Sequence, residues 1–363
     1  MNACWSAGLS LDAVRDCAAR ATGAPRLFLD QTSPFYWPFL AAFLAIAALV
    51  YLLSRRRPAG WSSRDGLRFV FPAGIWKHGS TRIDLIVFAL NLTFIPIATL
   101  SVALVSAPSV DAALLRYLGV PPLQLPTGIV GACIQFSIIA LVTGFAEYFQ
   151  HYLLHRIPAL WAIHRAHHSA EVLNLFTQFR MHPLEVAFAA LTVGSAGGLA
   201  LGLALYLGSG DLNQSAVWLW GTLIIGKNLV QNFRHSHIWI SYGRFFDRLF
   251  ISPSMHQIHH SIRPEHLGRN LGQILTVWDY LFGTLYVPRS KEELEFGVSP
   301  SERGPDNPHE SVRGFYIEPL LESWRAARRP TASYARGRDG QPDQAETRGA
   351  EPAETSALQK RST

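Results

Sequence analysis

The chain has 363 residues, of which 49% are hydrophobic and only 16% are charged, whereas an average soluble domain carries about 25% charged residues. This composition excludes an ordinary soluble domain and favours a membrane protein. The net charge of +6 does not indicate nucleic-acid binding, because the basic residues form no helix-turn-helix or RNP-like motif.

Long uncharged runs support a membrane location. A helix needs about 20 apolar residues to cross the hydrocarbon core of a bilayer, and four runs reach this length. A fifth, shorter run follows GSGD and is either a tilted span completed by KNLVQNF or the second arm of a re-entrant hairpin. The sequence therefore predicts an all-α, polytopic bundle with four or five membrane runs, at residues 35–53, 85–110, 127–146, 186–210 and 212–226.

The distribution of basic residues predicts the orientation of these runs. Seven arginines and lysines lie between Arg55 and Arg82, whereas the loop between the second and third runs holds only Arg116. By the positive-inside rule the first loop is cytoplasmic and the N-terminus lies outside. The histidine-rich stretches 151–182 and 235–260 then share the cytoplasmic side, where we expect a helical catalytic cap. The location expected is a bacterial-type inner membrane.

The composition divides the chain into five expected segments. The first 30 residues lack the basic start and short apolar core of a cleaved signal, so we expect the first run to be retained as an anchor. The C-terminal residues are polar and rich in Pro and Gly, which predicts disorder. The segments are an extracytoplasmic segment (1–33), N-terminal membrane helices (34–110), a catalytic domain (111–290), a cytoplasmic extension (291–326) and a disordered tail (327–363).

Ten of the 14 histidines fall in four short boxes. EYFQHYLLHR places two imidazoles four residues apart on a helix, and both HRAHH and HQIHH have the i, i+3, i+4 spacing of one helical face. NFRHSH supplies two more. Ser252 and Pro253 are suited to be the N-cap and first residue of a short helix that begins with the last box. The ten are His151, His155, His164, His167, His168, His235, His237, His256, His259 and His260.

This density of histidine predicts metal binding. Clustered imidazoles are costly to bury as cations or as unpaired neutral groups, and a metal ion takes up their lone pairs. Eight to ten imidazoles are too many for one tetrahedral zinc ion, so two metals are implied. Imidazole suits zinc, copper, iron and nickel alike, and this leaves the metal open. Outside the boxes, His78, His266 and His309 are expected to be ordinary, satisfied polar residues.

The boxes resemble those of the sterol desaturase/fatty acid hydroxylase superfamily. The match covers roughly residues 85–288 and includes LWAIHRAHHS, FRMHPLE, NFRHSH, MHQIHHS and the closing NLGQILTVWDYLFGT. The resemblance implies a non-haem di-iron site that activates O2 and hydroxylates or desaturates a lipid C–H position, within a fatty acid hydroxylase/sterol desaturase-like domain at 111–290. The metal ligands it implies are His151, His155, His164, His167, His168, His235, His256, His259 and His260.

Further residues near the boxes have open roles. His182, at the family's HP position, is either a ligand or a residue behind one. His237 stands where relatives often have Asn or Gly, so its role is undecided. Ligand histidines usually donate their second ring N–H to a carboxylate or carbonyl. The candidate carboxylates, of which Asp279 is the strongest, are Glu147, Glu185, Asp247 and Asp279.

The implied reaction requires partners outside this chain. Each turnover needs two electrons, and the sequence has no strand–GxGxxG–helix unit or thiolate cluster. We therefore expect a ferredoxin- or reductase-type electron donor, together with a lipid substrate from the bilayer. A zinc-dependent membrane hydrolase would have an HExxH glutamate, which no box contains. A metal transporter or non-catalytic metal-binding protein would favour ligands inside the spans. The sequence does not identify the lipid.

Overall fold

The computed structural model describes residues 28–29, 33–53, 63–105, 117–119, 125–208, 212–299 and 307–328. Helices dominate these residues, and their only β pairing is two isolated bridges, one of which joins Phe250 to Leu275. The expected all-α fold is confirmed for this part of the chain. Most of the expected N-terminal segment, and the expected tail from residue 329 onward, lie outside the described residues.

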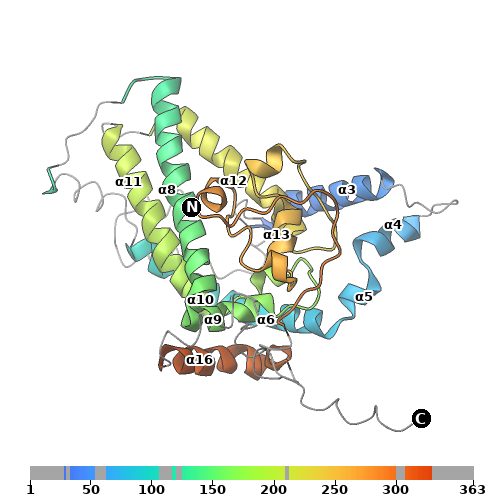
Figure 1. Cartoon of the computed structure of the whole chain (residues 1–363). Helices are drawn as coiled ribbons and strands as arrows, with labels where there is room; N and C mark the ends of the chain where they lie inside the picture. The colour runs from blue at the N-terminus through green and yellow to red at the C-terminus, as the bar shows by residue number, and fades with distance from the viewer. Residues whose placement is uncertain are drawn as a thin grey trace, which may run out of the picture. The chain divides into compact units, whose positions relative to one another are not determined.

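Three long helices form one side of the molecule. Helix α8 (Ile129–Arg156) is flanked by α11 (Ser195–Leu207) and α12 (Gln214–Arg234), which both pack against it (Figure 1). Helix α10 (Pro183–Ala189) and the π-helical turn η3 (Ala190–Gly194) lead into α11 without a break. Helix α12 is continuous through KNLVQNF, and both alternatives for the fifth run, a tilted span or a re-entrant arm, stay open.

Two of these helices are long and apolar enough to cross a membrane. They are Ile129–Arg156 and the combined helix Pro183–Leu207, and a third apolar helix, α3 (Trp37–Leu53), is shorter. Each overlaps most of one expected run, at 127–146, 186–210 and 35–53. The lengths of the described helices thus support two of the four or five expected crossings.

Helix α8 extends well beyond its apolar run. The uncharged stretch ends at Ala146, but the helix continues to Arg156 and carries the first histidine box on its last turns. It ends because Ile157 precedes a proline, which disfavours the helical conformation, and Ile157 is extended with φ −90° and ψ 118°. Pro158 then starts α9 (Pro158–His168), since its fixed φ suits a first helical position. This sharp turn brings the first and second boxes together.

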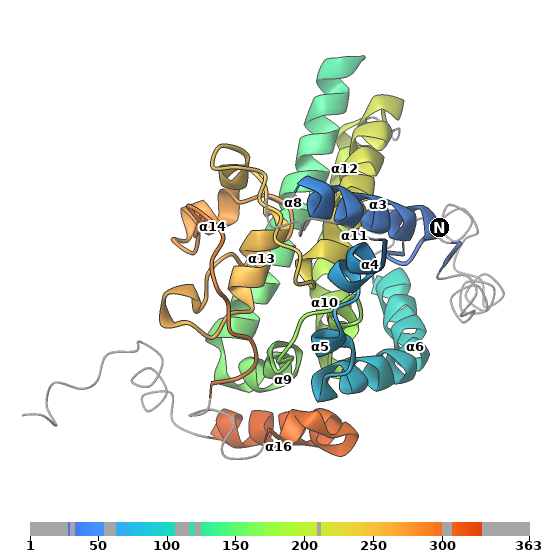
Figure 2. The ribbon, with the colours of Figure 1, turned by 90° about the vertical axis from the view of Figure 1, so that its right-hand side faces the viewer.

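The last histidine box lies on α13 (Pro253–His259). As predicted, Ser252 is the N-cap and Pro253 the first helical residue. The Ser252 hydroxyl bonds to Ser254 Oγ at 3.1 Å rather than to a backbone N–H. Helix α13 packs against α12, and α9 packs against the end of α8 (Figure 2). The short helix α14 (Val277–Leu281) follows and also contacts α8.

The N-terminal helices brace the region that carries the histidines. They are α3, α4 (Ser63–Val70), α5 (Ala73–Trp76) and α6 (Gly79–Val105). Phe43 and Ala47 of α3 pack with Phe233 and Ile238 in one buried cluster. The latter two residues flank His235, so burial of this apolar cluster fixes the backbone on both sides of that histidine.

A C-terminal helix closes the opposite side of the second box. Helix α16 (Val312–Arg328) places Phe315 in a buried cluster with Ala166, which lies between His164 and His167 on α9. Arg165 of α9 forms an ion pair with Glu322 of α16. The helix continues to Arg328, two residues beyond the expected end of the extension at 326. The buried Phe315 and the Arg165–Glu322 pair hold α16 against α9.

Candidate metal centre

Nine histidines from all four boxes converge in two groups. The first group holds five histidines and the second holds four, and within each group the candidate ligand atoms lie within 4.8 Å of one another. All nine are at most 8% exposed. They are the nine residues that the resemblance implies as ligands. The first group is His151, His155, His164, His168 and His259, and the second is His167, His235, His256 and His260.

The HxxHH boxes contribute to both groups. Helix α9 gives His164 and His168 to the first group and His167 to the second, whereas α13 gives His256 and His260 to the second and His259 to the first. In each box the i, i+4 pair serves one group and the i+3 residue serves the other. The groups adjoin, because the rings of His168 and His260 stack with centroids 4.5 Å apart.

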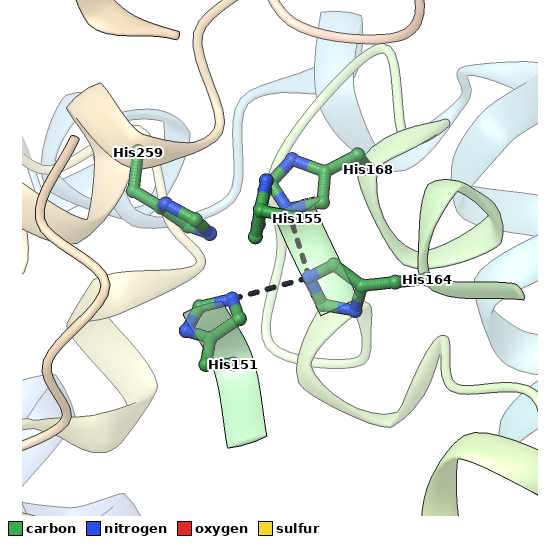
Figure 3. Close-up of side chains that lie close together, drawn as sticks. All are labelled: His151, His155, His164, His168 and His259. Atoms are coloured by element: carbon green, nitrogen blue, oxygen red, sulfur yellow. Dashed lines mark hydrogen bonds between the residues drawn. The ribbon is translucent and has the colours of Figure 1, made fainter. Parts of the chain in front are cut away.

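The hydrogen bonds of the first group turn the Nε2 lone pairs of its rings toward each other. His151 Nδ1 donates to the Leu271 carbonyl at 2.8 Å, and His164 Nδ1 donates to Glu185 Oε1 at 2.8 Å. A neutral imidazole has one N–H, so both Nε2 atoms carry lone pairs. These two Nε2 atoms are only 3.1 Å apart, and His168 Nε2 lies 3.2 Å from that of His164 (Figure 3). A cation between them resolves this repulsion.

The second group contains a triangle that protons cannot satisfy. The Nε2 atoms of His235, His256 and His260 are separated by 3.1, 3.1 and 3.2 Å. Each Nε2 of a neutral ring is either an N–H donor or a lone pair. In a triangle at least two of the three are the same, so at least one contact joins two donors or two acceptors. A metal ion binding all three lone pairs removes this conflict.

The spacing and the charge state of the rings both fit metal ions. Adjacent donors at right angles around a metal about 2.1 Å away are about 3.0 Å apart. Burial lowers the pKa of His167 to about 3, and it holds the pKa values of His168 and His260 well below 6.5. Neutral imidazole is the form that binds a metal. The two groups therefore have the donor chemistry of a dinuclear centre.

Glu185 is the carboxylate that contacts a ring of the metal centre. It lies on α10, is 3% exposed and accepts from His164 Nδ1. His182 lies outside both groups and is the N-cap of α10, because its Nδ1 accepts from the Leu184 N–H at 3.2 Å. Its Nε2–H donates to the Tyr316 carbonyl at 3.1 Å. Nδ1 thus caps the helix that presents Glu185, and Nε2 bonds the ring to α16.

Asp279 acts on a ring through the backbone rather than directly. It accepts from the N–H groups of Leu271 at 2.7 Å and Gly272 at 2.8 Å, and so fixes the loop whose Leu271 carbonyl holds His151. A Cβ on Gly272 would lie 2.6 Å from Asp279 Oδ2 and 2.8 Å from the Leu275 carbonyl oxygen. Only glycine permits this close approach.

The other candidates bond elsewhere. Glu147 pairs with Lys227 at 2.7 Å, and Asp247 accepts from the Tyr242 N–H at 3.0 Å. His237 Nε2 donates to the Phe69 carbonyl at 2.6 Å. Their positions near the boxes in sequence do not bring them into either group, because their side chains point toward neighbouring elements.

A buried network around Arg180 supports the second group. Arg180 is fully buried, and its backbone carbonyl accepts from His167 Nδ1 at 3.2 Å. Its guanidinium pairs with buried Asp84 at 2.9 Å and donates to Ser169 Oγ at 2.9 Å and to the His309 carbonyl at 3.1 Å. The sequence reasoning missed both Arg180 and Asp84. The signals available were an arginine within FRMHPLE and a lone aspartate beside an apolar run.

The histidines expected to be ordinary differ from one another. His266 bonds Glu292 at 3.0 Å, and His78 Nδ1 accepts from the Ser80 N–H at 3.2 Å. His309 is 1% exposed, and neither ring nitrogen has a hydrogen-bond partner in the described part of the chain. The expectation of a satisfied residue is wrong for His309, because its buried ring has no hydrogen-bond partner among the described residues, although Arg180 binds its carbonyl.

Comparisons with known proteins agree with this site. Residues 136–284, which contain all nine clustered histidines, match the family model described as fatty acid hydroxylase. The ornithine lipid hydroxylase OlsE of Rhizobium tropici is 27% identical over 266 residues, covering 72% of this chain and 71% of that protein. The alkylglycerol monooxygenase of Homo sapiens is 27% identical over 159 residues, covering 44% of this chain and 32% of that protein. No solved structure matches.

Buried histidine groups that could hold metal ions, on a scaffold with apolar helices, are typical of membrane-associated metalloenzymes. The matched region and the lipid-hydroxylating relatives support the resemblance to the sterol desaturase/fatty acid hydroxylase superfamily that the boxes indicate, and this resemblance is confirmed. The relatives are lipid hydroxylases and monooxygenases, which supports an oxygenase that hydroxylates a lipid. The apolar helices support membrane association. The chain spans about a third of the alkylglycerol monooxygenase.

Proposed function

We propose that the protein is a non-haem di-iron enzyme that uses O2 and external electrons to hydroxylate a C–H position of a membrane lipid. The observation that carries this proposal is the pair of adjoining, buried histidine groups whose Nε2 atoms face each other at 3.1–3.2 Å. The names of the relatives favour hydroxylation over desaturation. An all-imidazole donor set is compatible with iron.

Both histidine groups would bind iron. The first group would hold one iron and the second group the other, with His182, His237, Glu147 and Asp279 outside the set of ligands. Bound iron would supply the capacity to reduce dioxygen and to remove a hydrogen atom from the substrate. Every other contribution comes from this chain.

The protein fixes the rings before any metal binds. Glu185 and the carbonyls of Leu271 and Arg269 accept from His164, His151 and His259, so the Nε2 lone pairs already point inward. Such partners also raise the basicity of a ligand. Burial of all nine rings excludes water from the centre, which protects a reactive oxidant from side reactions.

We further propose the cellular arrangement that the sequence predicts. The protein would be a multi-pass protein of a bacterial-type inner membrane with four or five membrane runs. The histidine boxes would face the cytoplasm within a domain at 111–290. The lipid would enter from the bilayer, and a separate ferredoxin- or reductase-type protein would deliver electrons.

Metal analysis combined with oxygen uptake tests the proposal. Protein reconstituted anaerobically with Fe(II) should contain about two irons per chain and should consume O2 in the presence of a lipid extract and a competent reductant. Mass spectrometry should show a lipid that has gained one oxygen atom. Fewer than about one iron per chain, or no lipid-dependent uptake, would contradict the proposal. An oxygen-independent reaction supported by zinc would instead favour the hydrolase alternative.

A further inference from the structure

One exposed surface of the described chain is apolar. It consists of residues 245–250 and 277–282, and together these two segments form the apolar edge. Phe245 is 69% exposed and Tyr280 is 74% exposed, whereas Asp279 is fully buried. A surface that faces water normally has carboxylates outside and most large apolar side chains inside. The arrangement here is the reverse, and a contiguous patch of this kind indicates a contact with something other than water.

Backbone and buried polar groups hold the two segments side by side. Phe250 and Leu275 form a β bridge, and the Thr276 N–H donates to the Leu249 carbonyl at 3.1 Å. At the start of the first segment, the buried carboxylate of Asp247 accepts from the backbone before it. The exposure of the apolar side chains is therefore a fixed property of the fold, because the backbone that carries them is bonded at several points.

The apolar edge adjoins α8 at the point where the apolar run of that helix ends. The rings of Phe145 and Trp278 lie 5.0 Å apart, and those of Tyr148 and Phe282 lie 5.2 Å apart. Phe145 directly precedes Ala146, the last residue of the uncharged run. Helix α8 is long and apolar enough to cross a membrane, and α14 lies beside it (Figure 2). The edge therefore lies at the height where a spanning α8 would leave the hydrocarbon core.

The exposed charges of the apolar edge are basic. Arg244 directly precedes the first segment, Arg248 lies within it, and both are exposed. The carboxylates of the two segments, which the structure describes in full, are the buried Asp247 and Asp279. Aromatic and aliphatic side chains beside arginines are typical of segments that lie at a membrane surface, with rings among the acyl chains and basic groups near anionic headgroups. The composition of the edge thus favours a lipid surface over a protein partner.

We propose that the apolar edge inserts into one leaflet of the bilayer, with its aromatic rings just below the headgroups and with Arg244 and Arg248 at anionic headgroups. The membrane then holds the histidine-bearing part of the chain at this edge as well as through the crossing helices. This inference goes beyond the proposed function, because it holds whatever reaction the metal centre performs.

Spin labels on the full chain in nanodiscs test this placement. The discs contain dioleoylphosphatidylcholine and dioleoylphosphatidylglycerol, and the three native cysteines are replaced by serine. Labels are attached after Phe246→Cys or Leu281→Cys. Electron paramagnetic resonance then measures how often each label collides with O2, which partitions into lipid, and with a water-soluble nickel chelate.

Two further exposed positions provide the references. Leu141→Cys, on the apolar run of α8, gives the lipid-facing reference. Leu320→Cys gives an apolar position on α16, which lies beyond the histidine-bearing end of α8 in both views (Figures 1 and 2). Because all four positions are exposed, these substitutions should leave the thermal midpoint in detergent unchanged.

The collision rates decide the inference. Labels at positions 246 and 281 should collide several-fold more often with O2 than with the nickel chelate, as the label at 141 does, whereas the label at 320 should show the reverse. Labels at 246 and 281 that behave like the label at 320 overturn the inference. Protection from both reagents also overturns it, since a protein surface such as a second copy of this chain would then cover the edge. The assay needs no iron or reductant, so its outcome is independent of the proposed reaction.

Replacing the arginines tests the contact with headgroups. Arg244→Gln combined with Arg248→Gln should shift the equilibrium between inserted and water-exposed label at 246 by roughly fivefold per arginine in discs with phosphatidylglycerol. The same variant should have no effect in discs of phosphatidylcholine alone, whose headgroups carry no net charge. Arg313→Gln combined with Arg325→Gln, on exposed positions of α16, is the matched control and should change neither. If the first variant has no effect in either lipid, the assignment of these arginines to anionic headgroups is wrong.

Discussion

The two histidine groups have similar donors but different support. In the first group, Nδ1 of His151, His164 and His259 each donates to a defined acceptor, one of which is the carboxylate of Glu185. In the second group, His167 donates to a carbonyl, whereas the Nδ1 atoms of His235 and His256 are buried without a partner in the described residues.

This difference affects how each group should bind metal. A partner on Nδ1 fixes both the tautomer and the orientation of a ring and increases its basicity. The first group is therefore preorganised, while two rings of the second group are positioned by packing around Phe233 and Ile238. We expect the first group to bind iron more tightly and to fill first.

Removing one ligand from either histidine group should have the largest effect of the changes that compare the two groups. His164→Ala and His256→Ala should each lower lipid hydroxylation about a thousandfold or more, because metal catalysis supplies several kcal/mol. Each variant should keep about one iron per chain, measured by elemental analysis. The control His78→Ala should keep both irons. If either variant retains more than about a tenth of the activity, the two groups do not act as one centre.

Removing the support of the second group should have the next largest effect. Asp84→Asn removes the buried carboxylate that bonds the Arg180 guanidinium at 2.9 Å and leaves the more distant Glu310, at 3.6 Å, as its carboxylate neighbour, which should destabilise the protein by about 3–5 kcal/mol. The thermal midpoint in detergent should fall by about 10 °C, and iron should be lost from the second group before the first. The exposed pair offers a control, since Asp65→Asn, beside Arg68, should barely change the midpoint. An unchanged midpoint in Asp84→Asn would show that the Arg180 network does not brace this group.

Weakening the support of the first group should reduce the difference in iron affinity between the two groups. Glu185→Ala removes the acceptor of His164 Nδ1 and should lower iron affinity at the first group by about 10- to 100-fold. The second group should be unaffected, so that an iron titration with two distinct steps becomes nearly one step. The exposed Glu293→Ala serves as the control. Two unchanged steps in Glu185→Ala would mean that the carboxylate does not set the affinity.

The smallest expected effect is that of pH on the stability of the folded protein. Burial, together with the charges of the nearby Arg165 and Arg180, lowers the pKa of His309 from 6.5 to about 3. Because the unfolded chain takes up this proton more readily, stability is full above pH 6.5 and is lost as the pH falls from 6.5 toward 3. At pH 5.5 the loss is about 1.4 kcal/mol. His309→Leu should flatten the decline of the thermal midpoint below pH 6.5, whereas His78→Leu should not. Parallel declines would contradict this origin.

The sequence predicted which histidines form the centre better than it predicted how they divide into two groups. Spacing placed His151 and His155 on a helix, and Ser252 and Pro253 at the start of another, because these signals are local. The division of each HxxHH box between two groups was not predictable, since it depends on how α9 and α13 face each other. The spacing of residues along one helix shows which of them share a face, but it does not show which other element packs against that face.

The supporting residues were harder still to predict. Glu185 was one of four candidate carboxylates, and only the turn from α9 to α10 decides that it meets His164. Arg180 and Asp84 are 96 residues apart, so their pairing follows from the packing of α6 against the second box. The number of membrane crossings was also only partly predictable, because a run of apolar residues does not reveal whether a helix such as α3 crosses the bilayer or packs against α12.

The shared use of α9 and α13 has a consequence for assembly of the enzyme. Each of these helices supplies ligands to both groups, so the first ion to bind immobilises backbone that also carries the donors for the second. The entropy of ordering those donors is then largely lost in the first step, and the second ion binds to an already rigid site. The second group should therefore bind iron more tightly once the first group is filled than it would if the first group were empty.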